Sequence, residues 1–144
     1  MPKIGINIAT GSLQQPEIIV GIDLGTTNSL VAILHPDSRV PIALKDQEGL
    51  ALVPSLIYFD EQGGLVVGEQ ARPFLRSHPE RTIFSVKRLL GKSYKDIKDH
   101  QQHYAYKILD DDQDSLVKIQ MGERFYSPIE LSSFILKELK ARAE

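Results

Sequence analysis

An acidic residue, a glycine and four small polar residues lie close together in the stretch GIDLGTTNS, residues 21–29. The apolar residues before it predict a buried strand, where an unpaired Asp23 carboxylate would cost on the order of several kcal/mol of desolvation free energy. A hydrated Mg²⁺ ion would compensate for that charge, because Mg²⁺ prefers carboxylates and water and binds together with substrate phosphates. The sequence therefore predicts that Asp23 lies beside a metal ion.

The residues after Asp23 are suited to holding the phosphate itself. Gly25 has no side chain, so phosphate oxygens could approach its backbone closely. The N–H groups and polar side chains of Thr26, Thr27 and Asn28 could donate to those oxygens. A plain hairpin turn is the alternative, because a tight turn needs only glycine and polar residues. The P-loop, the dinucleotide-binding glycine pattern and the nucleophile elbow are all missing from the sequence.

Two predicted strands must position these residues. Residues 18–24 read as a buried strand, and residues 30–34 read as its hairpin partner, with GTTN at the turn. Further strands are predicted in VPIALKD, PSLIYFD and LVVG, and a meander of strands in residues 104–127. The stretch TIFSVKRLLG, residues 82–91, is predicted to be helical, with Gly91 at its C-terminal cap.

The last helix has the clearest local signals. Ser127 can cap it, Pro128 suits its first position, and Glu130 completes a capping box. Leu131 and Ile135 begin an apolar stripe at helical spacing. The pattern runs to the last residue without a stop signal, which fits a truncated chain and a natural end equally well.

Three separated motifs carry a family resemblance. VGIDLGTTNS resembles the first phosphate-binding hairpin of the actin-like ATPase superfamily. QEGLALVPSLIYF and TIFSVKRLLG follow at the expected distances, and both resemble the seventy-kilodalton heat-shock chaperones of the bacterial DnaK and HscA type. The resemblance extends from about residue 18 to the end of the chain.

The resemblance implies an α/β architecture. We expect part of an actin-like ATPase (ribonuclease H-like) fold, with a mixed sheet, flanking helices and a small inserted α+β subdomain. Residues 1–17 would be an N-terminal extension. Residues 18–55 and 127–144 would form the base lobe, and residues 56–126 the inserted subdomain.

The resemblance also implies roles for particular residues. Asp23 matches an aspartate beside the metal and its waters, and the cofactor would be ATP or ADP with Mg²⁺. Lys87 matches a catalytic lysine that reaches the γ-phosphate, although its pattern alone indicates only the water-facing side of an amphipathic helix. The turn that would hold the β- and γ-phosphates consists of Gly25, Thr26, Thr27 and Asn28.

The implied function is that of an ATP-dependent chaperone. The family's catalytic glutamate, second phosphate loop, adenosine loop and substrate-binding domain come later in its chains, so we expect the parent protein to be an ATPase and this piece to be inactive alone. Implied partners are unfolded polypeptide or an iron–sulfur scaffold protein, a J-domain co-chaperone and a nucleotide exchange factor. Implied processes are protein folding, stress response and iron–sulfur cluster assembly.

Three alternative functions remain open. A small-molecule kinase of the same superfamily predicts a sugar-binding constellation soon after the hairpin, and none is evident. An actin-like filament protein would also use the hairpin, but neither alternative gives FSVKRLLG a role. A non-catalytic interaction module that keeps the fold is the third alternative.

Composition narrows the partners and the compartment. The 144 residues carry a net charge of −2 and no cysteine. A basic nucleic-acid footprint is therefore not expected, and neither are disulfides. No apolar stretch approaches the length of a membrane span, so we expect no membrane partner. The absence of cysteine fits the reducing cytosol, and we expect a cytoplasmic protein. His100 and His103 have no further zinc ligands at suitable spacing, and the acidic run at residues 110–115 does not match a calcium loop.

Overall fold

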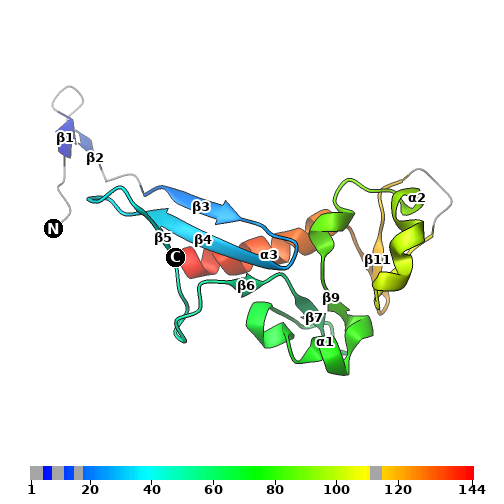
Figure 1. The fold of residues 1–144 in the computed structure, drawn as a ribbon. Helices are drawn as coiled ribbons and strands as arrows, with labels where there is room; N and C mark the ends of the chain where they lie inside the picture. Colours follow the sequence, from blue (N-terminus) through cyan, green and yellow to red (C-terminus); the bar gives the residue numbers. More distant parts are fainter. Residues whose placement is uncertain (1–4, 8–11, 15–17, 111–114) are drawn as a thin grey trace.

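A computed structural model describes residues 5–7, 12–14, 18–110 and 115–144 of the chain. It is a mixed α/β structure with several small sheets and one long helix (Figure 1). The largest sheet contains β3 (Val20–Asp23), β4 (Asn28–Leu34) and β5 (Pro41–Ala43), all antiparallel, and β6 (Val53–Pro54) also pairs with β4. The predicted hairpin of the first two strands is therefore confirmed, with Asp23 opposite Leu30.

The predicted burial of the first strand is wrong. Ile18 is 73% exposed and Ile22 is 48% exposed, and Asp23 is exposed as well. Among the described strands, β3 pairs only with β4, so it is an edge strand. A continuous apolar run indicates burial only where other elements cover both faces of the strand. The buried residues of this hairpin, such as Val31, lie instead on β4, which packs against the long helix.

The long helix α3 (Pro128–Ala143) confirms the predicted cap. The Glu130 N–H donates to Ser127 Oγ at 3.2 Å, and Glu130 Oε2 accepts from Ser127 N–H and Oγ–H at 2.7 and 2.9 Å. The apolar stripe faces the core, because Leu131, Ile135 and Leu139 are all 0% exposed. Burying such side chains stabilises the fold by about 1.5–3 kcal/mol each.

The C-terminal end of α3 is tied to a distant loop. The Arg142 guanidinium donates to the Leu50 carbonyl at 3.0 Å and approaches Asp46 Oδ2 at 3.4 Å. The Asp46 carboxylate also accepts from the N–H groups of Glu48 and Leu50, at 3.0 and 2.8 Å, and so closes the turn around QEG, residues 47–49. Helix and loop therefore hold each other in place.

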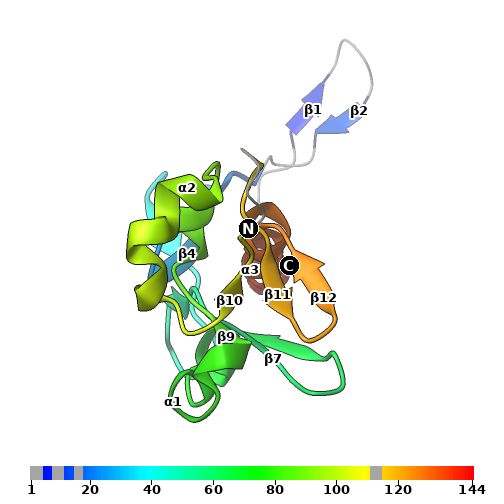
Figure 2. The ribbon, with the colours of Figure 1, turned by 90° about the vertical axis from the view of Figure 1, so that its right-hand side faces the viewer.

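The described part of residues 57–126 contains two three-stranded antiparallel sheets and several short helical turns. One sheet has the order β8-β7-β9 and the other β10-β11-β12, which confirms the predicted meander. Figure 2 looks nearly along α3, with β4 and α2 on one side and β11 and β12 on the other. The strands are β7 (Ile57–Phe59), β8 (Leu65–Val67), β9 (Thr82–Ile83), β10 (Lys107–Ile108), β11 (Ile119–Met121) and β12 (Arg124–Tyr126). The helical turns are η1 (Gly68–Ala71), α1 (Phe74–Ser77), η2 (Pro79–Arg81), η3 (Val86–Leu89), α2 (Tyr94–Ile97) and η4 (Lys98–His103).

The predicted helix over residues 82–91 is wrong. Thr82 and Ile83 form β9, which pairs with β7, and Ser85 has a left-handed backbone with φ 55°. The β-branched residues are suited to that sheet position, so tertiary pairing overrides the helical pattern. Only a single 3₁₀ turn, η3, follows. Gly91 does have the left-handed backbone expected of a cap, with φ 70°.

Near the N-terminus, β1 (Gly5–Asn7) and β2 (Ser12–Gln14) pair with each other. They pair with no other strand among the residues that the structure describes.

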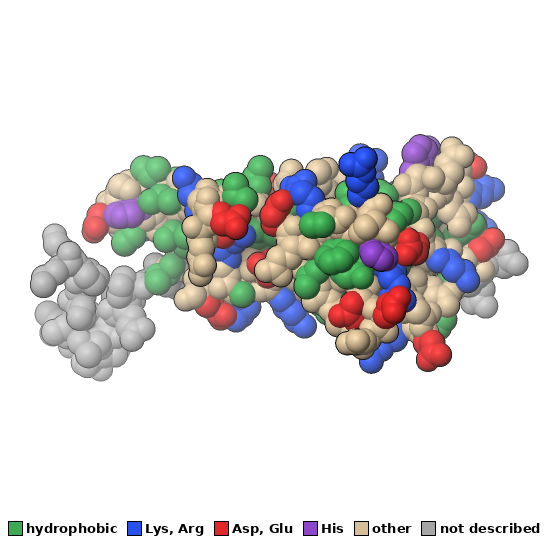
Figure 3. All heavy atoms as spheres, turned by 90° about the horizontal axis from the view of Figure 1, so that it is seen from below, with side chains coloured by type: hydrophobic (Ala, Val, Ile, Leu, Met, Phe, Trp, Pro, Cys, Tyr) green, Lys and Arg blue, Asp and Glu red, His purple; other side chains and the backbone are tan. Residues whose placement is uncertain are grey.

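The space-filling view of Figure 3 shows the molecule from below the view of Figure 1. On the described part of this face, acidic and basic side chains are interspersed with apolar ones. Within the described ranges, no helix has both the length and the apolar content that crossing a membrane requires.

Candidate functional site

The turn between β3 and β4 is held by two buried serine hydroxyls. The Gly25 N–H donates to Ser29 Oγ at 3.1 Å, and the Gly25 carbonyl accepts from Ser55 Oγ–H at 2.9 Å. The two hydroxyls lie 2.9 Å apart, and each serine is 1% exposed. The Ser55 N–H donates to the Thr27 carbonyl at 2.8 Å. Both sides of the turn are therefore fixed from within the protein.

Close backbone approach makes Gly25 obligatory. A Cβ atom built on Gly25 would lie 1.9 Å from the carbonyl oxygen of Asn28. No real Cβ contact is that short, and the obstacle is backbone, which cannot rotate away as a side-chain tip can. The turn therefore forms a compact backbone cradle that any larger residue would deform.

The outer side of the turn carries unused hydrogen-bonding groups. Thr27 and Asn28 are exposed and Thr26 is half-buried. Their side chains make no hydrogen bond to a residue that the structure describes. Donors that are unpaired on a rigid turn are suited to binding the oxygens of a phosphate group.

Asp23 lies at the end of β3, just before this turn. The predicted buried carboxylate is wrong: Asp23 is exposed, and within the described ranges it makes no hydrogen bond or ion pair. Desolvation therefore does not require a metal ion here. Asp23 nevertheless carries a carboxylate, a ligand type that Mg²⁺ prefers, and it lies two residues from the cradle.

Lys87 lies on η3, on a short turn with a buried inner side. Val86 is 1% and Leu89 0% exposed, whereas Lys87 and Arg88 point to solvent. The Lys87 ammonium makes no hydrogen bond or ion pair to any residue in the described ranges. The pattern of buried and exposed positions is therefore the one predicted for an amphipathic segment, although the segment is a single 3₁₀ turn.

An aromatic cluster holds the backbone before η3. The Tyr106 hydroxyl donates to the Phe84 carbonyl at 2.7 Å, and Tyr106 is 2% exposed. Its ring centroid lies 5.5 Å from that of Phe84 and 5.4 Å from that of Tyr104. Burial raises the pKa of the Tyr106 hydroxyl far above its ordinary value, so this group stays protonated and keeps donating. The next residue, Ser85, has the left-handed backbone described above.

The two parts of the candidate site share one support. No hydrogen bond or ion pair joins Lys87 to the Gly25 turn within the described ranges. However, α3 contacts both β4, which follows the turn, and η3, which carries Lys87. The position of one relative to the other therefore depends on this helix.

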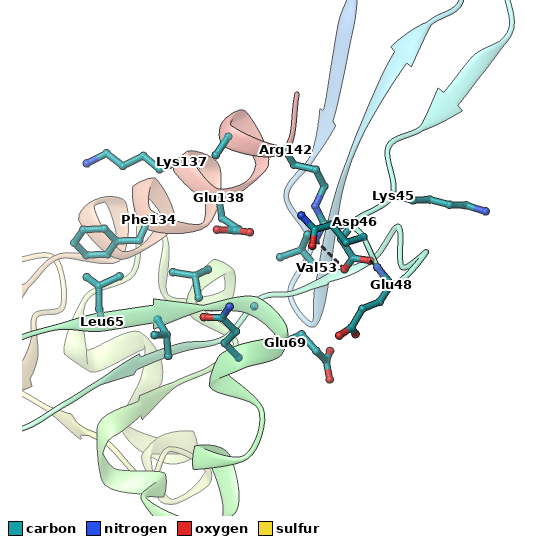
Figure 4. A pocket seen from close by; sticks show the side chains of 16 residues that line it. Lys45, Asp46, Glu48, Val53, Leu65, Glu69, Phe134, Lys137, Glu138 and Arg142 are labelled. Carbon is teal, nitrogen blue, oxygen red and sulfur yellow. Dashed lines mark hydrogen bonds and ion pairs between the residues drawn. The ribbon is translucent and has the colours of Figure 1, made fainter. Parts of the chain in front are cut away.

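A large cavity lies away from these residues. It has a volume of about 1050 Å³ between the C-terminal half of α3, the end of β8 and the loop around Asp46, and none of the predicted site residues lines it (Figure 4). Acidic and basic side chains such as Glu138 and Arg142 face the same space. Within the described ranges, no group of three or more His, Cys, Asp or Glu side chains could hold a metal ion on its own.

Sequence reasoning missed the residues that support the site. Ser29 and Ser55 are small polar residues within apolar runs, and such residues need hydrogen-bond partners when buried, which was a usable signal. Tyr106 gave no such signal, because an alternating tyrosine in a strand usually indicates only packing.

Comparison with known proteins shows which family the chain belongs to. Residues 19–144 match the family model described as Hsp70 protein. The chain therefore belongs to the Hsp70 family, and the predicted family is confirmed. Membership implies an actin-like ATPase fold, and binding of ATP or ADP with Mg²⁺ is general for the family.

Two similar proteins are chaperones by name. The chain is 42% identical over 129 residues to the "Chaperone protein HscA homolog" of Photobacterium profundum, covering 90% of this chain and 20% of that protein. It is 37% identical over 126 residues to the "Chaperone protein dnaK3" of a Synechocystis species, covering 87% of this chain and 16% of that protein. The chain thus spans about a fifth or less of the length of these relatives.

Proposed function

We propose that this chain forms one side of the ATP site of an ATP-dependent chaperone. The main support for this proposal is the turn at Gly25, whose backbone is held by hydrogen bonds to Ser29 and Ser55. The donors on the outer side of this turn are unpaired within the described ranges. Family membership supports the assignment, because the family binds nucleotide.

The residues present fit a magnesium nucleotide. On its inner side, the backbone at Gly25 leaves no room for a Cβ atom. The neighbouring residues Thr27 and Asn28 are exposed, so a ligand can reach their donors from solvent. In this proposal, Thr26, Thr27 and Asn28 donate to the β- and γ-phosphates, and Asp23 accepts from the water shell of Mg²⁺. The metal ion, when bound, neutralises phosphate charge that would otherwise be repelled by the carboxylate.

Lys87 is the proposed catalytic group of this chain. Its ammonium is unpaired within the described ranges, and a flexible four-carbon stem can carry it from η3 toward a γ-phosphate. A positive charge there would stabilise charge that develops during phosphoryl transfer. The platform under it, Val86 and Leu89 with the Tyr106–Phe84 hydrogen bond, keeps the starting point of that stem fixed.

We also propose the wider arrangement that the resemblance implies. Residues 18–55 and 127–144 would form the base lobe and residues 56–126 a small inserted subdomain. Phosphoryl transfer depends on several positioned groups, so the chain would not hydrolyse ATP at a useful rate alone. Together with the remaining length of its relatives it would drive cycles of binding to unfolded polypeptide or an iron–sulfur scaffold protein. A J-domain co-chaperone and an exchange factor would assist.

Nitrogen-15 NMR of the 144-residue chain tests the phosphate site directly, because it detects weak binding. We expect MgATP to shift the amide resonances of residues 23–28, and we expect Asp23→Asn and chelation of Mg²⁺ to abolish those shifts. Asp37→Asn, an exposed aspartate in the next loop, is the matched control and should leave them unchanged. Shifts that are absent at millimolar MgATP, or that are indifferent to Mg²⁺, would refute the proposal.

Turnover is tested separately. The chain alone should release no phosphate above background, and extension by the roughly 250 following residues of the parent protein should restore ATPase activity. Lys87→Ala in the extended protein should then lower kcat by about 100-fold or more while leaving MgATP binding nearly intact. Binding without restored turnover would instead favour a non-catalytic interaction module.

A further inference from the structure

A second cavity carries an excess of basic side chains that the proposed ATP site does not use. It has a volume of about 350 Å³ and lies where η3, α2 and η4 meet. Its floor includes Ile97, which is 5% exposed. The polar and aromatic side chains on its walls are Arg88, Lys92, Asp96, His100, His103 and Tyr104.

The two permanent cations at this cavity are unpaired within the part of the chain that the structure describes. Neither the Arg88 guanidinium nor the Lys92 ammonium makes a hydrogen bond or an ion pair with a residue in the described ranges. Elsewhere in the chain, the guanidinium of Arg72 pairs with Glu69 at 2.7 Å, and that of Arg142 approaches Asp46 at 3.4 Å. The cavity therefore concentrates positive charge that no described ion pair neutralises.

The carboxylate on the wall has other partners. Asp96 Oδ2 accepts from the Ser93 N–H at 2.7 Å and from Ser93 Oγ–H at 2.9 Å, in the capping box of α2. These hydrogen bonds, and to a smaller extent the charge of Lys92, hold the pKa of Asp96 below its usual range, so this one carboxylate offsets only one of the two cations.

Further polar side chains line the same space. His103 Nδ1 lies 3.0 Å from the His100 carbonyl. Since a carbonyl only accepts, we assign a proton to Nδ1, so that Nε2 of the neutral ring is an acceptor and not a donor. The Tyr104 hydroxyl is a donor at neutral pH, and burial raises its pKa further above the ordinary value of 10.0, although the charge of Arg88 opposes this shift. The two histidine rings lie 6.0 Å apart, centroid to centroid.

We propose that this cavity is a binding site for a small phosphate-bearing molecule, separate from the Gly25 turn. A guanidinium binds phosphate through two parallel hydrogen bonds, and an ammonium adds a compact charge beside it. Ile97 and the aromatic rings supply an apolar surface on which the rest of a small ester can lie. The cavity is large enough for pyrophosphate or a sugar phosphate, and its polar groups come from three different elements.

Inorganic pyrophosphate is the first probe. We would follow the amide resonances of the 144-residue chain at constant ionic strength, because salt screens exposed charges. Saturable shifts should appear at residues 88–104. Arg88→Gln with Lys92→Gln should weaken binding by about tenfold or more, since two charged donors are lost. Arg76→Gln with Lys118→Gln removes the same charge outside the cavity and should change affinity by less than about twofold.

Other arms separate the sources and the alternatives. Inorganic phosphate, ribose 5-phosphate and sulfate show whether free phosphate, an ester or any dianion is preferred, and we expect the ester to bind more tightly than sulfate. If the glutamine pair disturbs the spectrum of the fold, Arg88→Lys with Lys92→Arg keeps the charge but moves the donors, and it should still weaken binding. Non-saturating shifts, or equal weakening in both glutamine pairs, would overturn the proposal.

The same titration distinguishes this site from the proposed ATP site. Asp23→Asn should leave pyrophosphate binding at residues 88–104 unchanged. Shifts confined to residues 23–28 would overturn the second site while leaving the proposed function intact.

Discussion

The Gly25 turn and the Lys87 turn are both held in place by a hydrogen bond from a buried hydroxyl, but they differ in what they position. Each carries, on the outside of a short segment, a group that we propose acts on phosphate. Each is held from inside by a buried hydroxyl that donates to a backbone carbonyl. Ser55 donates to the Gly25 carbonyl at 2.9 Å, and Tyr106 donates to the Phe84 carbonyl at 2.7 Å.

They differ in what must be positioned. At Gly25 the donors belong to the backbone and to short side chains, so their placement depends closely on the path of the chain. At Lys87 the functional group sits on a long flexible stem, so the backbone need only provide a stable starting point. The Gly25 turn should therefore tolerate far fewer substitutions than the Lys87 turn.

The largest effect is expected from Gly25→Ala. The new Cβ would meet the Asn28 carbonyl at 1.9 Å, so the turn must deform. We expect the free energy of unfolding to fall by about 3 kcal/mol. We also expect the MgATP-dependent shifts of residues 23–28 to disappear. Denaturant unfolding measures the first and NMR the second. Gly21→Ala is the control, because nothing lies within 4 Å of its Cβ. Equal losses in both variants would contradict the close-approach argument.

Ser55→Ala should have the next largest effect. It removes the donor to the Gly25 carbonyl and the partner of Ser29, so we expect a loss of about 1–3 kcal/mol in the free energy of unfolding. In a double-mutant cycle with Ser29→Ala, the two effects should be clearly non-additive. Ser133→Ala removes an exposed hydroxyl bond on α3 and should cost less than about 0.5 kcal/mol. Additive effects would show that the two hydroxyls do not act together.

Tyr106→Phe probes the second turn. It removes the hydroxyl that donates to the Phe84 carbonyl but keeps the ring packing, so we expect a loss of about 1 kcal/mol by denaturant unfolding. Tyr104→Phe is matched, because its hydroxyl makes no hydrogen bond to a residue in the described ranges, and it should be nearly neutral. A larger loss in Tyr106→Phe than in Ser55→Ala would reverse the comparison between the turns.

The smallest effect concerns the helix that supports both turns. Hydrogen bonds from the Ser127 N–H and hydroxyl lower the pKa of Glu130 from its ordinary value of 4.5. A group whose pKa is lowered by folding contributes stability above its unfolded pKa and loses it as pH falls through the folded value. Stability should therefore decline slightly below about pH 4.5 in denaturant unfolding, and in Glu130→Gln this part of the decline should be absent. Glu138→Gln, whose carboxylate makes no hydrogen bond within the described ranges, should retain it.

Local signals predicted one part of the molecule well. The β3–β4 hairpin, the meander and the cap of α3 all rest on interactions between residues close together in the sequence, such as Ser127 with Glu130. The predicted helix over residues 82–91 failed because the fate of Thr82 and Ile83 is decided by pairing with β7, which is distant in sequence. The predicted burial of Asp23 failed for a similar reason, because burial of a strand depends on the elements that cover it.

The sequence by itself determined the tight turn at Gly25, the capped final helix and the family, because each depends on the order of nearby residues. Only the tertiary structure decided that Asp23 is exposed and that Ser55 holds a turn 30 residues away by donating to the Gly25 carbonyl. It also decided that Lys87 lies on a 3₁₀ turn, just after the Phe84 carbonyl to which the Tyr106 hydroxyl donates. The physical reason is that burial and long-range hydrogen bonds are set by partners brought together in space, which no local pattern encodes.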